Sequence, residues 1–244
     1  MERYHKIPFL TVLKHVKVLR PVIRAQYDRQ APALGKERMG IKFSGPVGVA
    51  AGIDKRGEFT DAIACYSPAF IEIGPLRDVR FAISQLQKRE TTVPVFANLS
   101  NAQNLERSFP LIYDFVDAIV LNISQGSNVS QVIDHLIELR RYNDEYKPVL
   151  FKIFPDITSE ALDSVATYML GSGIDGLIVG AELFDKVREK TMGLLPIVVT
   201  AEISSPERAA QLLDSGADLI AVTNSPFHYG PNLIKRIIKY LEKR

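Results

Sequence analysis

The sequence has one cysteine, no tryptophan and no apolar run as long as a membrane-spanning helix, which needs about 20 residues. Cys65 has no second cysteine to pair with, so an internal disulfide is excluded. The start of the chain lacks the charged region, apolar core and small-residue cleavage site of a secretory signal. These absences predict a cytoplasmic protein.

An excess of charge of one sign is also lacking. The 244 residues include 30 Lys and Arg and 28 Asp and Glu, which gives a net charge of +2. A chain so balanced has no overall attraction to polyanions, so we expect no nucleic-acid partner. The four histidines are not spaced as metal ligands, and no metal site is expected. The length and the 46% hydrophobic content fit one α/β barrel or two smaller domains.

The positive charge is concentrated in the basic N-terminal segment, residues 1–45, which holds ten Lys and Arg against three Asp and Glu. Apolar residues between positions 9 and 23 fall at helical spacing with basic residues between them, which predicts an amphipathic helix bent or split at Pro21. This helix either closes one end of the main domain, residues 46–244, or makes a peripheral contact with the inner membrane surface through residues 6–24.

From Val47 onward, short runs rich in Val and Ile alternate with helical stretches. The runs lie at 47–52, 70–74, 93–99, 117–123, 149–154, 175–181, 196–201 and 218–224. Thr158, Ser205 and Pro231 are typical helix-start residues before three of the stretches. Eight strands that alternate with helices predict a (β/α)8 barrel, the TIM barrel, over residues 46–244. An open doubly wound sheet is the alternative.

Several polar residues lie late in these apolar runs or just after them. Because alternate residues of a barrel strand face inward, such side chains must find partners in the barrel mouth, where barrels carry their chemistry. We therefore expect one pocket for a small-molecule ligand. Its polar residues would be Asp54, Lys55, Glu72, Asn98, Asn122 and Lys152.

Lys152 lies within the run VLFKIF, where a lysine either has an anionic partner or loses its charge. A structural ion pair with Glu72 or Asp156 is one interpretation, and a nucleophilic amine is another. Hydrogen bonding at the barrel rim is the structural alternative for Asn98 and Asn122.

Six segments together resemble the dihydroorotate dehydrogenases, a family that catalyses a flavin-dependent step of pyrimidine biosynthesis. GPVGVAAGIDKRGE (45–58) is similar to the signature after the family's first barrel strand. The others follow in family order: VPVFANLSN (93–101), DAIVLNISQGSN (117–128), LFKIFPDIT (150–158), GIDGLIV (173–179) and SGADLIAVTNSPFHYGP (215–231). The resemblance implies a flavin oxidoreductase that holds FMN at the barrel mouth. The residues implied to line the flavin are Ala50, Ala51, Gly52, Lys55, Asn98, Asn122 and Lys152.

The substrate side departs from the family pattern. Gln125 stands where the family has its Ser or Cys base, and an amide cannot take up the proton. Ser127 replaces an asparagine that holds the pyrimidine, and the segment between Gly74 and Val93 lacks the family's substrate lid. No catalytic residue is therefore assigned, and the conversion of dihydroorotate to orotate is expected to be reduced or lost.

The phosphate side departs as well. Ala201 and Glu202 replace a glycine pair, and Ser225 replaces a further glycine. Ala181 and Glu182 replace an asparagine and a threonine. A carboxylate beside the phosphate opposes the usual pose, so FMN binding is expected to be weak or absent. Two alternatives to a flavin enzyme remain: a noncatalytic barrel paralogue for ligand sensing or protein contacts, and a Schiff-base lyase that uses Lys152.

Overall fold

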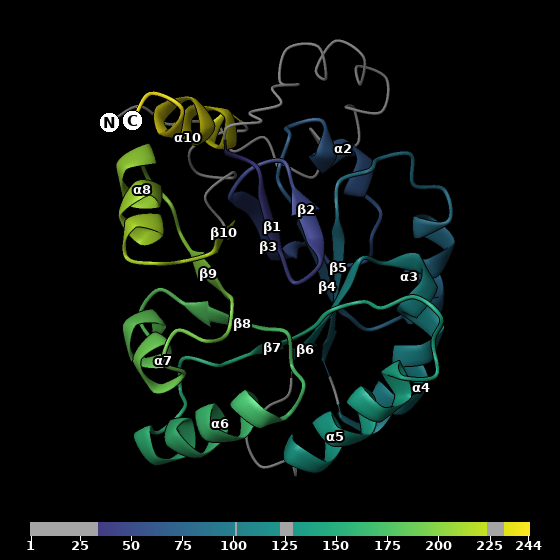
Figure 1. Ribbon diagram of the computed structural model, residues 1–244. Coiled ribbons are helices and arrows are strands. Elements are labelled where there is room, and N and C mark those ends of the chain that lie inside the picture. Colours follow the sequence, from purple (N-terminus) through teal and green to yellow (C-terminus); the bar gives the residue numbers. More distant parts are fainter. Residues whose placement is uncertain (1–33, 101, 123–128, 224–231) are drawn as a thin grey trace.

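The computed structural model describes residues 34–100, 102–122, 129–223 and 232–244. Within these residues the chain forms a closed barrel of eight parallel strands with helices outside it (Figure 1). The strands follow one another around the barrel in chain order, and the last pairs with the first to close it. This confirms the TIM barrel and excludes the open sheet.

Every strand expected from the sequence is present, with its ends shifted by a few residues. The barrel consists of β3 (Val47–Asp54), β4 (Ile71–Leu76), β5 (Val95–Ser100), β6 (Ala118–Asn122), β7 (Val149–Lys152), β8 (Gly176–Gly180), β9 (Ile197–Ala201) and β10 (Leu219–Val222). Because both strand faces are buried, one in the interior and one under helices, the runs are apolar except for a few polar residues near their carboxyl ends.

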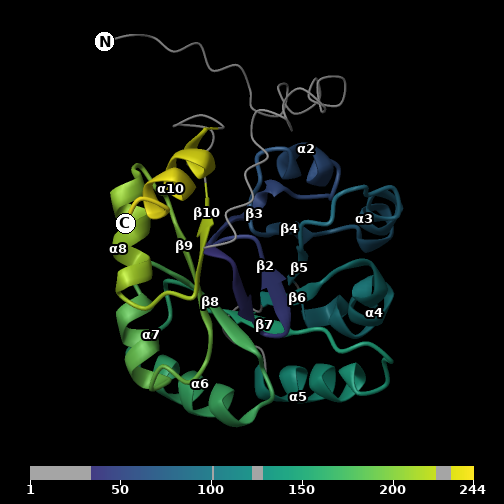
Figure 2. The same cartoon turned by 45° about the horizontal axis from the view of Figure 1, so that its top comes forward.

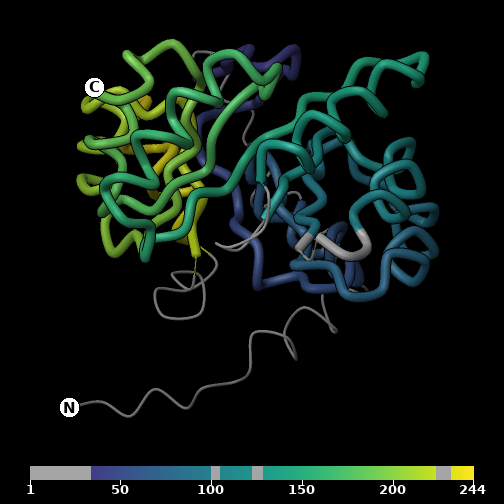
Figure 3. The backbone as a smooth tube through the Cα atoms, turned by 90° about the horizontal axis from the view of Figure 1, so that it is seen from below, coloured from purple at the N-terminus to yellow at the C-terminus, as the bar shows by residue number. Residues whose placement is uncertain are grey.

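The helices cover the outer face of the barrel, as the tube view shows (Figure 3). They are α2 (Thr60–Ala64), α3 (Val79–Leu86), α4 (Ala102–Ile112), the 3-10 turn η2 (Tyr113–Phe115), α5 (Val129–Arg140), α6 (Ser159–Gly171), α7 (Phe184–Lys190), α8 (Pro206–Asp214) and α10 (Leu233–Leu241). The expected caps are confirmed, because Thr158 Oγ1 accepts from the Ala161 N–H at 3.2 Å and Ser205 Oγ from the Arg208 N–H at 3.3 Å. Pro231 lies outside the described residues.

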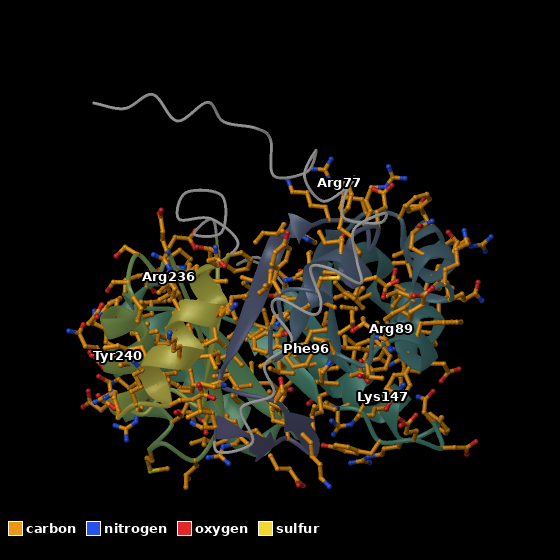
Figure 4. The ribbon with its side chains drawn as sticks, turned by 90° about the horizontal axis from the view of Figure 1, so that it is seen from above. Arg77, Arg89, Phe96, Lys147, Arg236 and Tyr240 are labelled. Atoms are coloured by element: carbon orange, nitrogen blue, oxygen red, sulfur yellow. The ribbon has the colours of Figure 1, made fainter. Side chains whose placement is uncertain are left out.

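Three phenylalanines fill the barrel interior. The rings of Phe70 and Phe96 are stacked with their centroids 4.8 Å apart, and Figure 4 shows Phe96 near the middle of the molecule. The Phe43 ring meets both of them edge to face, at 6.0 and 6.1 Å. All three side chains are buried, so the interior is packed with side chains.

Phe43 belongs to an antiparallel hairpin, β1 (Lys36–Arg38) and β2 (Ile41–Phe43), that lies across the ring of strands (Figure 2). Arg38 Nε pairs at 2.6 Å with the carboxylate of Asp218, which immediately precedes β10. The hairpin therefore covers the amino-terminal end of the barrel.

The hairpin corrects the expected extent of the basic N-terminal segment, which was interpreted as helical up to residue 45. Residues 36–38 and 41–43 are strands instead, because Met39 and Gly40 both adopt positive φ angles and reverse the chain between them. The amphipathic helix expected around residues 6–24, with its bend at Pro21, lies outside the described residues. Among the helices that are described, none is both long and apolar enough to cross a membrane.

Candidate functional site

A polar network joins five consecutive strands, β3 to β7, at the carboxyl end of the barrel. Its hub is Glu72 on β4, whose side chain is 0% exposed. Lys152 Nζ, from β7, lies 3.2 and 3.5 Å from the two oxygens of Glu72, and the Asn98 amide of β5 donates to Glu72 Oε1 at 2.5 Å. The backbone N–H of Ala51, on β3, donates to Glu72 Oε2 at 3.0 Å. The carboxylate is thus held by an ion pair and by hydrogen bonds, which is what a buried charge requires.

Of the two acidic partners considered for Lys152, Glu72 is the one that the structure shows. Glu72 was expected in the pocket but was not among the residues implied to line a flavin. A signal for its role is present in the sequence, because FIEIG places a single carboxylate inside an apolar strand.

The hub fixes the orientation of both asparagine amides. Because an ionised carboxylate only accepts hydrogen bonds, Asn98 turns its NH2 group toward Glu72 and its oxygen toward Asn122. Asn122 Nδ2 then donates to Asn98 Oδ1 at 3.2 Å. Asn122 Oδ1 is left as a buried acceptor that finds no hydrogen-bond partner in the described structure. The network therefore ends in a position that a donor group on a ligand would satisfy.

The end of β3 offers open backbone beside this network. Ala50 is buried, Ala51 is half-buried and Gly52 is exposed, with free space where a β-carbon of Gly52 would stand. Lys55 is exposed, and the described contacts do not join it to Glu72. The structure thus brings Asn98, Asn122 and Lys152 together, as strand alternation predicts, and the binding of a flavin by these residues stays a prediction.

The expectation that Asp54 belongs to the pocket is wrong, because its carboxylate does not join the polar network. Its carboxylate accepts from the backbone N–H groups of Phe59 at 2.9 Å, Glu58 at 3.0 Å and Arg56 at 3.4 Å, and from Thr60 Oγ1 at 3.2 Å. Asp54 therefore holds the turn between β3 and α2. Burial raises the pKa of Asp54 above its ordinary value, against the lowering effect of these hydrogen bonds.

We expect Asp54→Ala to lower the free energy of unfolding by about 2 kcal/mol at neutral pH, because several donors lose their acceptor. A raised pKa in the folded state means that the folded protein binds more protons, so the contribution of Asp54 to stability is largest below its unfolded pKa and falls as the pH rises. The stability difference between wild type and variant, measured by urea unfolding, should therefore shrink from about pH 4 upward. A difference that grows with pH would contradict the assignment.

Three other residues singled out in the sequence lie outside the described residues: Gln125, Ser127 and Ser225. Glu202 follows β9 and is exposed. Between β4 and β5, where the family's lid was missing from the sequence, the chain forms α3.

Comparisons with known proteins found similar sequences and similar folds. No family model matches the chain. Among curated proteins, dihydroorotate dehydrogenase (quinone) from Coxiella burnetii is 25% identical over 83% of this chain and 82% of its own length. The protein of that name from Haemophilus ducreyi is 23% identical over 83% and 86%.

Solved structures share the fold. Ligand-free dihydroorotate dehydrogenase from Eimeria tenella superposes with a TM-score of 0.76 at 18% identity, covering 93% of both chains. A mandelate oxidase variant with an FMN adduct superposes with a TM-score of 0.63 at 12% identity, covering 86% of this chain and 77% of its own. The curated matches agree with the segments identified in the sequence, and the chain is similar to the dihydroorotate dehydrogenases over most of its length.

Proposed function

We propose that this chain is a dihydroorotate dehydrogenase-like flavin oxidoreductase that holds FMN at the barrel mouth, and that its conversion of dihydroorotate to orotate is reduced or lost. One observation carries the proposal. The network of Lys152, Glu72, Asn98 and Asn122 spans four strands at the carboxyl end of the barrel and ends in a buried acceptor without a partner.

The residues fit the ring of a flavin. Ala51 and Gly52 leave backbone that a flat ring could cover, and Asn122 Oδ1 suits a ring N–H donor. Lys152 keeps a positive charge at this end of the barrel, held in place by Glu72. When bound, FMN supplies the two-electron chemistry, and a nearby cation stabilises negative charge on a reduced ring.

The residues expected beside the FMN phosphate favour tight FMN binding less. Glu202 follows β9, where the resemblance implies that the phosphate lies. We expect Glu202→Gln to tighten FMN binding by about tenfold or more, because a negative charge is removed beside a dianion. Titration of flavin-free protein by fluorescence quenching measures this. Glu207→Gln, at an exposed position on α8, is the matched control and should leave the affinity unchanged. Equal, tight binding by wild type and Glu202→Gln would contradict the repulsion.

The direct test of the proposal is the visible spectrum of the purified full-length protein. Bound flavin gives a yellow protein that releases FMN on denaturation. Protein that remains colourless after incubation with excess FMN and gel filtration would favour the alternative, a noncatalytic barrel paralogue that senses a small ligand or contacts proteins.

The Schiff-base alternative loses support, because a lyase lysine needs a neutral amine and Lys152 is ion-paired with a fully buried carboxylate. Peripheral membrane contact through residues 6–24 and a cytoplasmic location remain part of the proposal, and both rest on the sequence pattern alone.

A further inference from the structure

A second carboxylate lies over the inner face of β8. Ile178 belongs to the barrel interior and Val179 to the outer core, so strand alternation turns Gly180 inward. A β-carbon added at Gly180 would overlap the carboxylate of Glu182. The Glu182 side chain therefore folds back over the end of its own strand and occupies the place of an inward side chain at the mouth.

This carboxylate lies next to the polar network but is not neutralised by it. Ile178 is the register partner of Lys152 on the neighbouring strand β7, so Gly180 lies about 6.6 Å further toward the mouth along β8. The charge of Lys152 is already matched by Glu72. Glu182 is exposed, and the described residues give it neither a hydrogen bond nor an ion pair.

Two open acceptors thus stand on either side of β7. Asn122 Oδ1 lies on β6 and the Glu182 carboxylate covers the end of β8. Lys152, whose charge is matched by Glu72 of β4, extends from the strand between them. A ligand in this position meets acceptors where a ligand carboxylate would need donors. The negative charge of Glu182 disfavours a ligand that carries a carboxylate. The two unmatched acceptors favour a ligand that brings N–H groups.

We propose that Glu182 is the specificity-determining residue of the barrel mouth, selecting neutral or cationic rings that carry an amino group and rejecting rings that carry a carboxylate. The proposal rests on the mouth being the ligand site of the proposed function. Where a flavin ring takes up Asn122 Oδ1, the selectivity rests on the Glu182 carboxylate alone.

Three pyrimidines that differ at one ring position test this. Uracil carries hydrogen there, orotate a carboxylate, and the corresponding aminouracil an amino group. Isothermal titration of the full-length wild type is expected to give the affinity order aminouracil, uracil, orotate. In Glu182→Gln the affinity for orotate relative to uracil should rise at least about tenfold, and that for the aminouracil relative to uracil should fall severalfold.

A second variant separates the position of the carboxylate from its charge. Gly180→Ala keeps Glu182 but displaces its flexible side chain from the inner face, so it should shift the three affinities in the same direction as Glu182→Gln. Glu138→Gln, at an exposed position near the end of α5, removes the same charge away from the mouth and should change none of them.

Unchanged ratios in Glu182→Gln, or failure of all three pyrimidines to bind both wild type and variant, would overturn the selectivity proposal. The flavin content of the same preparations is read independently from their visible spectra. A colourless protein that still discriminates among the three rings would therefore refute the proposed flavin function and leave the role of Glu182 standing.

Discussion

Lys152→Met is expected to lower the free energy of unfolding by about 3–5 kcal/mol, because it leaves the carboxylate of Glu72 buried without its counter-charge. Glu72 is 0% exposed, and a methionine side chain brings neither a charge nor a hydrogen-bond donor in place of the ammonium group. The Asn98 amide and the Ala51 N–H would remain as hydrogen-bond donors, but they carry no net charge. Urea unfolding followed by circular dichroism measures the loss.

Two further variants test the cause. The double variant Lys152→Met with Glu72→Gln should recover a large part of the stability, since no unpaired charge remains. Lys190→Met removes a lysine whose partner, Asp163, is exposed, and it should change the stability little. If Lys152→Met were as stable as the wild type, the buried ion pair would not be what holds this end of the barrel together.

Dihydroorotate oxidation by this chain is expected to be about 10²–10⁴-fold slower than in a dehydrogenase with its general base in place. Gln125 occupies the position of the base in the sequence, and an amide has no basic site that could accept the proton. The enzyme from Coxiella burnetii is a suitable reference. Reduction of a quinone analogue with dihydroorotate as the electron donor measures the rate.

Gln125→Ser and Gln125→Cys should raise that rate if the missing base limits it. Neither variant should change the visible spectrum of bound flavin, because a spectral change would point to an altered cofactor rather than to a restored base. A wild-type turnover of roughly 1–10³ per second, as in ordinary enzymes, would contradict the assignment of Gln125.

Periodicity was sufficient to predict the barrel and the inward direction of Asn98, Asn122 and Lys152. Each lies two residues after an interior side chain, namely Phe96, Val120 and Leu150. Because β5, β6 and β7 pair in regular register, alternation holds along them to the end.

The same reasoning placed Asp54 wrongly in the pocket, and the cause is the geometry of β3. The register between β3 and β4 shifts between Val49 and Asp54, and Gly52 adopts a φ angle of 102°, so alternation breaks before the strand ends. The hairpin was missed because Met39 and Gly40 do not form one of the common turn pairs. In both cases the local backbone geometry determines the structure, and the pattern of apolar and polar residues does not predict that geometry.

The packing of Phe43, Phe70 and Phe96 in the barrel interior has a kinetic consequence. Rings that fill the interior, with the hairpin across the amino-terminal end, leave the carboxyl end as the only way in among the described parts of the chain. An electron donor and an electron acceptor that both react at the mouth must then enter through this one end of the barrel, one after the other. Their initial-rate plots against each other should give parallel lines, the mark of a ping-pong sequence, and each should act as a competitive inhibitor of the other at high concentration.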